Sequence, residues 1–413
     1  MSAAGGREIV VVGAGAAGFF GAIRCAEAAP DATVHLLEAT AHPLAKVRVS
    51  GGGRCNVTHA CFDPRELVRR YPRGSRELIG AFHRFGPQET IAWFAQRGVE
   101  LKTEADGRMF PVTDSSATIV DALTTAAARA GVRLRTQTPV REIVRGEDGR
   151  FRISCGSGEV PAADRVLLAT GGNQGAGGIA IARAFGHAIE PQVPSLFAFN
   201  VSDPRLRGLE GVAVQDASVA MPDARLIERG PVLVTHRGLS GPAVLRLSAW
   251  GARACQESGY AFGVVVNWTP GHRSEEIAAA LAREREAHGR RQVATANPFG
   301  LPGRLWEVLV SAAGVPAGCV WAQTSKAMLG ALAAQIGESR FAVQGKSTNK
   351  EEFVTCGGVR LREVDFKTME SRLCPGLHFA GEVLDIDGIT GGFNFQAAWA
   401  TGWLAGTAMA GVT

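Results

Sequence analysis

The feature that most constrains the fold is a glycine-rich turn near the amino terminus, Gly13-Ala14-Gly15-Ala16-Ala17-Gly18. It follows an apolar run over residues 7–12, which we expect to be a buried strand, and it opens a helix predicted over 16–29. A second strand predicted over 32–38 ends in an acid. A lone pattern of this kind is weak evidence, but here it lies inside a strand-helix-strand unit. The sequence therefore predicts a Rossmann-like α/β domain that binds a dinucleotide.

Each glycine of this turn has a separate physical task. Gly13 permits the tight turn, Gly15 lets a pyrophosphate approach the backbone, and Gly18 lets the helix pack on the sheet. The helix N-terminus would present unpaired N–H groups to the phosphates, and Glu38 would accept from ribose hydroxyls. A purely structural turn is the alternative. The predicted cofactor contacts here are Gly13, Gly15, Ala16, Ala17, Gly18, Glu38 and Ala39.

Three consecutive glycines form a second signal, in the segment SGGGRCNVTH over residues 50–59. Consecutive glycines leave the backbone free to follow a ligand closely. Lys46, Arg48 and Arg54 could neutralise phosphate, and Asn56 could donate or accept at a polar ring edge. A surface loop is the alternative interpretation. The predicted cofactor contacts here are Lys46, Ser50, Gly51, Gly52, Gly53, Arg54 and Asn56.

Two further glycine-rich turns end predicted strands, at residues 170–172 and at 381–382. Asp385 and Asp387 follow the second turn, and a last helix is predicted to open at 391–394. A carboxylate can bind ribityl hydroxyls, and a helix N-terminus can stabilise negative charge at the N1/O2 edge of a reduced flavin. Structural turns are again the alternative. The predicted contacts with FAD here are Thr170, Gly171, Gly172, Gly381, Glu382, Asp387, Gly392, Phe393 and Asn394.

Composition excludes several other classes of protein. The eight cysteines include no C-x-x-C pair, which argues against a dithiol flavin reductase and a zinc ribbon, so we expect no metal. There is no apolar run of about 20 residues, and the first apolar run is too short for a signal peptide. We therefore expect a cytoplasmic protein with reduced thiols. The net charge of +5 is dispersed and does not identify a nucleic-acid binder.

The character of the chain changes twice along its length. Alternating strands and helices indicate a mostly parallel sheet in the first part, short strand-like runs occupy 195–269, and helical patterns occupy 273–338, with Ser274 as a candidate N-cap. The strand-then-helix character returns from about residue 346. We expect a split FAD-binding domain over 1–192 and 346–413, an inserted β-barrel-like subdomain over 193–270 and a helical subdomain over 271–345.

Six segments carry a family resemblance: the glycine-rich segment at 50–59, GRMFPVTDSSA at 107–117, ATGG at 169–172, THRGLSGPAVLRLS at 235–248, TCGGV at 355–359, and 368–402. On these segments the chain resembles the BaiN/RdsA family of NAD(P)/FAD-dependent oxidoreductases, also called YhiN-like flavoproteins. The resemblance implies FAD in a two-dinucleotide-binding fold, NAD(P)H as a transient donor, and a backbone contact of Val140 with the adenine. One departure is a shortened loop at 173–178.

The reaction itself requires little from the protein, because flavin N5 can exchange a hydride without a protein nucleophile. His236 is the best candidate for a catalytic acid or base, since histidine can move a proton near neutral pH. A structural loop histidine is the alternative, and Ser240 is a second polar candidate.

Three functions are consistent with the sequence. The first is reduction of an unsaturated small molecule with NAD(P)H as donor. The second is reduction of uridine in RNA, because family members are linked both to unsaturated steroid intermediates and to dihydrouridine in ribosomal RNA. The third is non-catalytic flavin binding. Four tryptophans could stack bases, although core packing is the alternative; they are Trp250, Trp268, Trp306 and Trp321.

Overall fold

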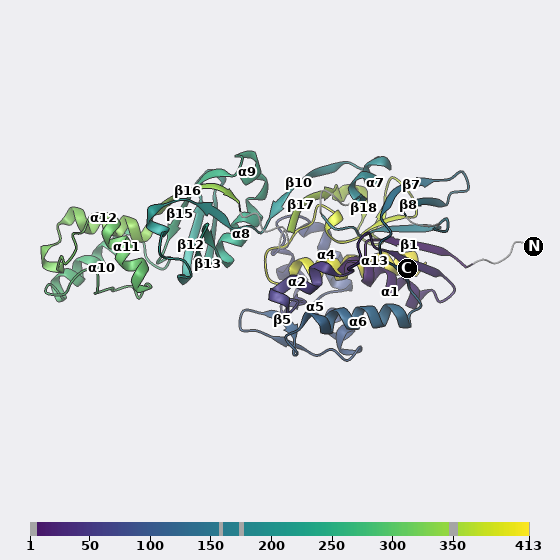
Figure 1. Cartoon of the computed structure of the whole chain (residues 1–413), viewed down its shortest axis with the longest axis horizontal. Helices are drawn as coiled ribbons and strands as arrows, with labels where there is room; N and C mark the ends of the chain where they lie inside the picture. Colours follow the sequence, from purple (N-terminus) through teal and green to yellow (C-terminus); the bar gives the residue numbers. More distant parts are fainter. Residues whose placement is uncertain (1–5, 157–159, 173–176, 347–353, 413) are drawn as a thin grey trace, which may run out of the picture. The chain divides into compact units, whose positions relative to one another are not determined.

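The computed structural model describes residues 6–156, 160–172, 177–346 and 354–412. Contacts divide the chain into two units, one formed by Met1–Pro194 with Lys350–Thr413 and the other by Ser195–Asn349 (Figure 1). The first unit is therefore discontinuous in sequence. Whether the parts of the second unit are separate subdomains, with the boundaries expected from the sequence, stays a prediction.

The first unit is built on a seven-stranded sheet. Its strands are β1 (Glu8–Val12), β2 (Thr33–Leu37), β6 (Arg133–Arg135), β9 (Arg165–Leu168), β18 (Val364–Asp365), β19 (Glu370–Ser371) and β20 (Leu377–Phe379). Their order is β18-β19-β20-β9-β1-β2-β6. The five strands from β20 to β6 are parallel, and β18 and β19 add antiparallel pairs. A mostly parallel sheet with an antiparallel addition is the architecture that the sequence predicted.

Helices α1 and α13 pack together in the core of this unit (Figure 1). The helices of the unit are α1 (Ala16–Ala28), α2 (Ala45–Gly53), α3 (Pro64–Val68), α4 (Ser75–Arg84), α5 (Pro87–Ala95), α6 (Ser116–Arg129), α7 (Gly178–Ala184) and α13 (Phe393–Met409). An aromatic cluster joins them, since Phe20 of α1 contacts both Trp93 of α5 and Trp399 of α13. Aromatic side chains bury large apolar areas, so this cluster stabilises the helices that flank the sheet.

Three small sheets complete the first unit. They contain β3 (Thr58–His59), β4 (Leu101–Thr103) and β5 (Arg108–Pro111); β7 (Val140–Arg145) and β8 (Phe151–Cys155); and β10 (Ile189–Ser195) and β17 (Val354–Val359). The loop after the ATGG turn lies partly outside the described residues, which omit 173–176. Where the description resumes, Gly178 begins α7.

The second unit contains a closed six-stranded barrel in the order β11-β14-β13-β12-β15-β16. These strands are β11 (Phe199–Val201), β12 (Ala213–Met221), β13 (Leu226–Thr235), β14 (Gly238–Ser240), β15 (Ala261–Asn267) and β16 (Ser339–Lys346). Its helices are α8 (Pro242–Trp250), α9 (Ala252–Glu257), α10 (Ser274–Ala287), α11 (Gly303–Ala312) and α12 (Lys326–Gly337). The expected barrel and helical patterns are both confirmed.

Two details of the second unit differ from expectation. Trp268, Trp306 and Trp321 are buried, so they pack the core and cannot stack on bases, whereas Trp250 is 37% exposed. The N-cap of α10 is Arg273 rather than Ser274, and the Glu276 carboxylate accepts from the Arg273 backbone N–H at 2.7 Å.

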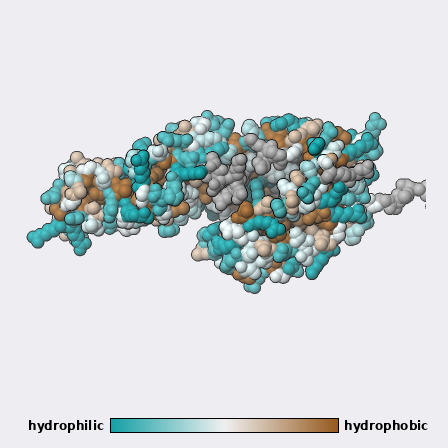
Figure 2. Space-filling view, viewed as in Figure 1, coloured by the Kyte–Doolittle hydropathy of each residue, from teal (hydrophilic) through white to brown (hydrophobic). Residues whose placement is uncertain are grey.

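The face of this unit seen in Figure 2 is largely hydrophilic. Within the described residues, no helix is both long and apolar enough to cross a membrane.

Candidate cofactor site

Four of the predicted segments meet at one edge of the large sheet. Val12 pairs with Leu37 and with Leu168, and Leu168 pairs with Phe379, so the four strands end at the same level. Parallel strands place the turns that follow them at a common carboxyl edge, and ligands bind there where the strand order reverses. In this sheet the reversal is at β1, which has β2 on one side and β9 on the other.

The first glycine turn combines two glycines that packing requires with one that borders open space. Gly13 has φ +102°, and a Cβ there would lie 2.5 Å from the carbonyl oxygen of Ala169. A Cβ on Gly18 would lie 1.9 Å from the carbonyl oxygen of Gly13, so both glycines are required by backbone packing. A Cβ on Gly15 would have no heavy atom within 4 Å. Gly15 therefore borders open space at the start of α1, where a diphosphate needs room.

Within the part of the chain that the structure describes, the start of α1 has no acid in its first turn, and the Glu38 carboxylate bonds Ala14, two residues before the helix. Its N-cap is Gly15, and among the described residues no side chain caps this end. The first backbone N–H groups of a helix lack partners within the helix, and the helix dipole favours negative charge beside them. Ala16 and Ala17 supply such groups, so this end suits a phosphate.

Glu38 closes the turn from the neighbouring strand. Its carboxylate accepts from the backbone N–H of Ala14 at 3.0 Å and from the backbone and hydroxyl of Thr40, both at 2.9 Å. The backbone N–H of Thr138 donates to the Glu38 carbonyl at 2.8 Å, two residues before Val140 begins β7. Glu38 thus contacts the segment that leads into Val140, Ala39 next to it is exposed, and the contact of these residues with an adenosine stays a prediction.

The three glycines at 51–53 end α2 with a non-helical backbone. Gly51, Gly52 and Gly53 have φ values of +58°, +69° and +84°, which a residue with a side chain rarely adopts. A Cβ on Gly51 would lie 2.9 Å from the Phe110 ring, whereas a Cβ on Gly52 or Gly53 would have no heavy atom within 4 Å. Gly51 is thus needed for packing, while the next two glycines border open space.

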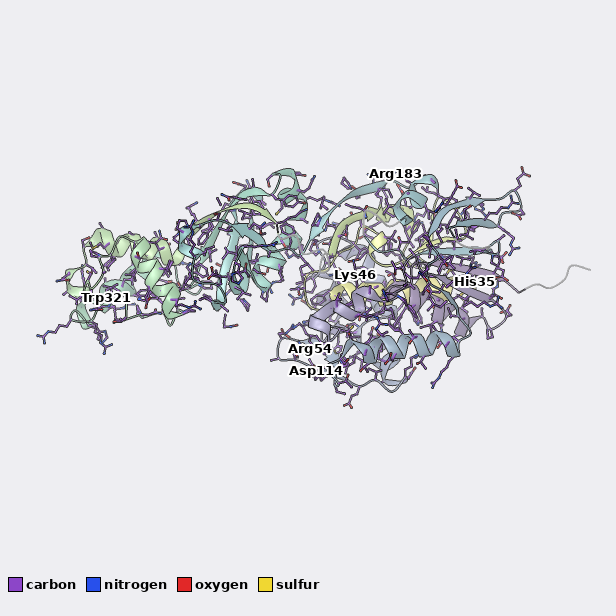
Figure 3. The ribbon with its side chains drawn as sticks, viewed as in Figure 1. His35, Lys46, Arg54, Asp114, Arg183 and Trp321 are labelled. Carbon is purple, nitrogen blue, oxygen red and sulfur yellow. The ribbon has the colours of Figure 1, made fainter. Side chains whose placement is uncertain are left out.

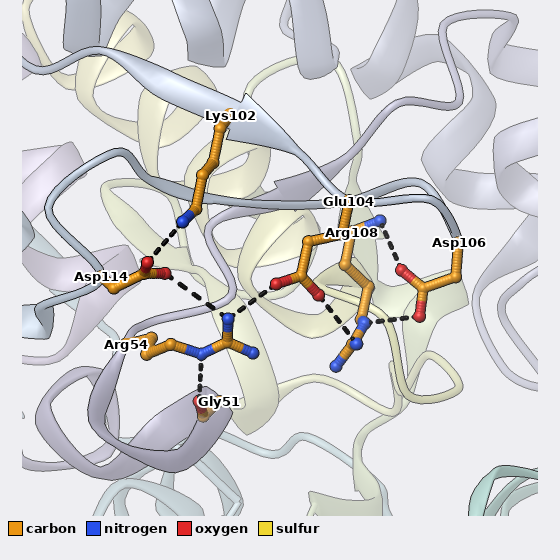
Figure 4. Close-up of polar contacts among 7 residues, drawn as sticks. All are labelled: Gly51, Arg54, Lys102, Glu104, Asp106, Arg108 and Asp114. Carbon is orange, nitrogen blue, oxygen red and sulfur yellow. Dashed lines mark hydrogen bonds and ion pairs between the residues drawn. The ribbon is translucent and has the colours of Figure 1, made fainter.

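Arg54 is held by acidic partners (Figure 4). Its Nη1 lies 2.6 Å from Glu104 and 3.5 Å from Asp114, and its guanidinium carbon lies 4.0 Å from the centre of the Phe110 ring. The hydrogen bond to Glu104 is the main cause of the raised pKa of Arg54. Its Nε also donates to the Gly51 carbonyl at 3.4 Å. Arg54 therefore fixes the glycine segment, and its contact with a cofactor stays a prediction.

The partners of Arg54 belong to an ion network on β4, β5 and the loops beside them (Figure 4). Glu104 also accepts from Arg108 at 2.9 Å, and Arg108 contacts Asp106 at 2.7 Å. Lys102 donates to Asp114, and this hydrogen bond is the first cause of the lowered pKa of Asp114. Figure 3 shows Arg54 and Asp114 together in the first unit. Each charge in this network lies beside an opposite charge.

Lys46, Glu382 and the glycine pair after β9 lie together. Lys46 forms an ion pair with Glu382, whose side chain is 16% exposed. A Cβ on Gly171 would lie 3.9 Å from the same carboxylate, and a Cβ on Gly172 would lie 3.1 Å from the Glu382 carbonyl. The Thr170 hydroxyl is buried and has no hydrogen-bond partner among the described residues. This corner therefore holds a polar atom that a ligand could satisfy.

Helix α13 runs in the same direction as α1 where the two touch. A Cβ on Gly402 would lie 2.4 Å from the Ala17 carbonyl, and a Cβ on Gly406 would lie 2.4 Å from the Gly21 carbonyl. The start of α13 at Phe393 precedes Gly402 by nine residues, which corresponds to about 13 Å of helix. Helix α13 therefore begins about two and a half turns before the point where it meets the start of α1, so its N-terminus extends past the N-terminus of α1.

The start of α13 resembles that of α1 in having a glycine N-cap and, among the described residues, no acid in the first turn. Gly392 is its N-cap with φ +89°, and within the described residues no side chain caps it. A Cβ on Gly392 would lie 2.6 Å from the Thr58 carbonyl, so this glycine is required. With its amide oriented to satisfy both groups, Asn56 accepts from the Gly392 N–H at 3.0 Å and donates to Thr58. Asn56 is thus engaged within the protein.

Two of the residues predicted at the flavin have protein partners, and their contact with a cofactor stays a prediction. Asp387 is fully buried and forms an ion pair with Arg73 through both carboxylate oxygens. Asn394 bonds both backbone groups of Gly388, at 2.8 and 2.9 Å. The sequence analysis missed Arg73 and Tyr71, whose hydroxyl donates to the Phe393 carbonyl at 2.6 Å. A buried Asp requires a cation, which is the signal that could have predicted a partner for Asp387.

Two supporting contacts at the carboxyl edge were also missed. The side-chain amide of Gln192 donates to the Gly172 carbonyl at 2.8 Å. The hydroxyl of Thr401 accepts from the Gly381 N–H at 3.0 Å, which joins the turn after β20 to α13. Neither residue lies in a recognisable pattern, because each acts on backbone that is distant from it in sequence.

The proposed catalytic residues belong to the second unit. His236 is exposed in the turn between β13 and β14, and Ser240 is half-buried at the end of β14. The glycine turns all belong to the first unit. A catalytic role for His236 or Ser240 stays a prediction.

The first unit fits FAD on three observations. The N-termini of the parallel helices α1 and α13 have no side-chain cap among the described residues and lie about 13 Å apart along the helix direction. This spacing suits an extended molecule with electron-rich groups near both ends. Gly15, Gly52 and Gly53 border open space, so a ligand can approach the backbone there. The Thr170 hydroxyl, which has no hydrogen-bond partner within the part of the chain that the structure describes, lies at the same edge of the sheet.

Comparison with known proteins decides the family. The sequence matches the family described as "HI0933-like protein Rossmann domain" over residues 7–408. The chain belongs to this HI0933-like family. The resemblance drawn from the sequence and the Rossmann-type FAD-binding fold are therefore both confirmed. The HI0933-like chain is a flavin-dependent oxidoreductase, so non-catalytic flavin binding is no longer needed as an alternative.

Two curated relatives of this HI0933-like chain match it over almost its full length. The ribosomal RNA dihydrouridine synthase of Escherichia coli (strain K12) is 31% identical and covers 96% of both chains. The 3-dehydro-bile acid Δ(4,6)-reductase of Clostridium scindens is 30% identical and covers 98% of this chain and 99% of its own.

Solved structures agree on the fold of the HI0933-like chain. The 3-ketosteroid-Δ4-(5α)-dehydrogenase of Rhodococcus jostii RHA1 matches with a TM-score of 0.51 at 18% identity, covering 98% of this chain and 97% of its own. The 3-ketosteroid Δ1-dehydrogenase of Sterolibacterium denitrificans matches with a TM-score of 0.52 at 11% identity, covering 98% and 99%. At these identities the likeness concerns the fold alone.

Proposed function

We propose that this protein reduces a carbon–carbon double bond conjugated to a carbonyl group, using FAD as its resident cofactor and NAD(P)H as the electron donor. The proposal rests mainly on the parallel helices α1 and α13, whose N-termini lie at different levels. Among the described residues, neither N-terminus has a side-chain cap or an acid in its first turn. Both full-length relatives have names that imply such a double bond, in uridine and in a dehydro-bile acid. The proposed substrate is a small molecule.

Each end of the site has a proposed task. The first N–H groups of α1 hold the diphosphate, and Glu38 binds the ribose hydroxyls by exchanging its contacts with Ala14 and Thr40. The start of α13 stabilises negative charge at the pyrimidine edge of the isoalloxazine. Bound FAD would supply hydride transfer at its N5 atom. His236 is the proposed proton donor to the second carbon.

An anaerobic two-step assay tests this function. The purified holoprotein is first mixed with NADH or NADPH, and loss of the oxidised flavin absorbance is the expected result. The reduced protein is then offered conjugated enones, with saturated ketones as matched controls, and reoxidation by the enones alone is expected. Flavin that neither nicotinamide reduces would contradict the donor, and reduced flavin that ignores every enone would contradict the substrate class.

A second candidate function, reduction of uridine within RNA, is favoured by the distribution of charge. Residues 195–349 contain 16 Lys and Arg against 12 Asp and Glu, so nearly all of the net charge of +5 belongs to the second unit. Arg207, Arg237 and Arg304 are exposed there. Arg304 donates to the Gly208 carbonyl at 2.8 Å, and the pKa of Glu210 is lowered mainly by hydrogen bonds from the backbone of Glu210 and Gly208, with smaller contributions from His236 and Arg304.

RNA binding can be separated from small-molecule reduction. A ribosomal RNA fragment should bind the holoprotein with an affinity that falls steeply as salt rises, because phosphate contacts release counterions. The double variant Arg207→Gln/Arg304→Gln should lower both the affinity and the salt slope. RNA affinity that does not change with salt, or that is the same in this double variant, would count against the RNA function.

We further propose that the reaction takes place in the cytoplasm, because the eight cysteines form no disulfide.

A further inference from the structure

The strongest unexplained feature is a buried clamp on the turn that leads into α13. In the segment 70–74, between α3 and α4, Arg73 forms an isolated antiparallel bridge with Asp387, in the segment 386–389. The Ile389 N–H donates to the Arg70 carbonyl at 2.9 Å, and a Cβ on Gly74 would lie 2.7 Å from the Ile386 side chain. The two segments are more than 300 residues apart in sequence and contact each other closely.

An ion pair lies at the centre of this clamp. Arg73 Nε and Nη2 each donate to a different oxygen of Asp387. The Asp387 side chain is 0% exposed and that of Arg73 is 11% exposed. Removing one partner of a buried pair leaves an uncompensated charge, which is strongly unfavourable. Because both carboxylate oxygens face Arg73, the primary partner of Asp387 is this guanidinium rather than a ribityl chain.

The clamp reaches the first residues of α13 by two routes. Next to Asp387, the backbone of Gly388 bonds the Asn394 side chain twice, at 2.8 and 2.9 Å. From the other segment, the Tyr71 hydroxyl donates to the Phe393 carbonyl at 2.6 Å. Both routes fix the turn that contains Gly391 and Gly392, which have φ values of +135° and +89°. Glycines make such a turn adaptable, so side chains must set its conformation.

We propose that Arg73 is a positioning residue for the flavin. It acts through Asp387 and does not touch the cofactor. By fixing residues 386–392, it holds the first N–H groups of α13 at the pyrimidine edge of the isoalloxazine. The inference rests on the FAD site of the proposed function and assigns Asp387 to this clamp instead of to direct FAD binding.

The clamp predicts an effect on redox properties as well as on affinity. A reduced flavin carries more negative charge at its pyrimidine edge than an oxidised flavin does, so a well-placed helix N-terminus stabilises the reduced form more strongly. Loosening the turn should therefore weaken FAD binding and also make the midpoint potential more negative. A residue that only supported folding would change stability without shifting the potential of the flavin that remains bound.

The test compares four variants of the full-length protein. Arg73→Met removes the cation, Arg73→Lys keeps the charge without the two-pronged geometry, and Arg73→Met/Asp387→Asn removes both charges. Arg69→Met is the matched control, because Arg69 is 73% exposed and pairs with Glu66 on α3. Each apoprotein is titrated with FAD, and the midpoint potential of each holoprotein is measured against a reference dye.

We expect Arg73→Met to raise the FAD dissociation constant by about tenfold or more and to shift the potential to more negative values. Arg73→Lys should restore part of both changes, and Arg69→Met should change neither. If Arg73→Met does not fold, the double variant takes its place, with the same expected direction and a smaller size.

Unchanged FAD affinity and potential, in Arg73→Met or in the double variant, would overturn the proposal. So would a lower affinity with an unchanged potential, because that pattern indicates a purely structural residue. These measurements need no substrate and no nicotinamide. A failure of the proposed enone reduction therefore leaves this test readable, and a failure of this test leaves the enone assay unaffected.

Discussion

The two ends of the proposed FAD site are built differently. At the start of α1, a six-residue turn and one acid on the next strand supply almost everything, and Gly15 borders open space. At the start of α13, three side chains from segments distant in sequence hold the turn, namely Asn56, Tyr71 and Arg73, and Asn394 bonds the nearby backbone of Gly388. A diphosphate needs only exposed N–H groups, whereas a redox-active ring needs N–H groups held in one place.

The largest effects are expected from substituting two glycines at the start of α1, and the two substitutions should have different results. Gly15→Val should abolish FAD binding while the apoprotein stays folded, because the new side chain enters open space and the backbone φ of −88° suits any residue. Gly18→Val should prevent folding, because its Cβ would overlap the Gly13 carbonyl oxygen. Flavin absorbance and circular dichroism of the purified variants check both. A yellow Gly15→Val protein would contradict the proposed position of the diphosphate.

The second end should respond to a smaller change. Tyr71→Phe removes one hydroxyl and leaves the buried Phe393 carbonyl without that donor. We expect a loss of about 1–3 kcal/mol in the free energy of unfolding, together with weaker FAD binding. Urea unfolding of the apoprotein and FAD titration measure the two effects. If Tyr71→Phe binds FAD as tightly as the unmodified protein does, the route from residue 71 to the start of α13 plays no part in binding.

A buried histidine in β20, His378, should make the free energy of unfolding depend on pH. Burial lowers the pKa of His378 to about 4, and its Nδ1 lies 3.1 Å from the Thr368 carbonyl. The unfolded chain binds this proton at a higher pH than the folded chain does, so stability is full above about pH 6.5 and falls as the pH drops toward 4.

His378→Asn keeps a donor for the Thr368 carbonyl and removes the titrating group. Between pH 6.5 and 5.5, the unmodified protein should lose about 1 kcal/mol more stability than this variant. Urea unfolding at the two pH values provides the comparison. Equal losses in both proteins would show that His378 does not contribute to the pH dependence.

The smallest effect is expected in the ion network that holds Arg54 beside the glycine segment (Figure 4). Lys102→Gln removes the hydrogen bond that most lowers the pKa of Asp114, so this pKa should move back toward its ordinary value. The stabilisation by Asp114 is present above its ordinary pKa and is lost as the pH falls through the lowered value. Because the network is exposed, salt should reduce the difference in the free energy of unfolding between Lys102→Gln and the unmodified protein. Unfolding measured in low and high salt checks this.

The sequence predicted features that depend on neighbouring residues. Gly13, Gly15 and Gly18 follow a strand and precede a helix, so their roles follow from backbone geometry alone. The parallel sheet and the barrel were predictable for the same reason, because strand and helix patterns repeat locally. Partnerships across the fold were not predictable. Nothing near Asp387 indicates that its cation is Arg73, since the topology brings them together only after the sheet has formed.

The same limit applies to two residues whose protein partners the sequence did not predict. Arg54 and Asn394 have the right chemistry for a cofactor and lie in glycine-rich segments, so pattern alone favoured direct contact. The structure gives Arg54 two acidic partners and gives Asn394 the backbone of Gly388. A polar side chain in such a segment can serve the ligand or the loop that holds it, and only the positions of its neighbours distinguish the two.

The close contact of α1 with α13 has a consequence for biosynthesis. Gly402 and Gly406 let the backbones of these helices meet, although a complete second unit is encoded between them. A ribosome that has finished the second unit has still to make β20 and α13. Until then, α1 exposes the surface that α13 will cover, so the nascent chain passes through a stage in which chaperones have a natural binding surface.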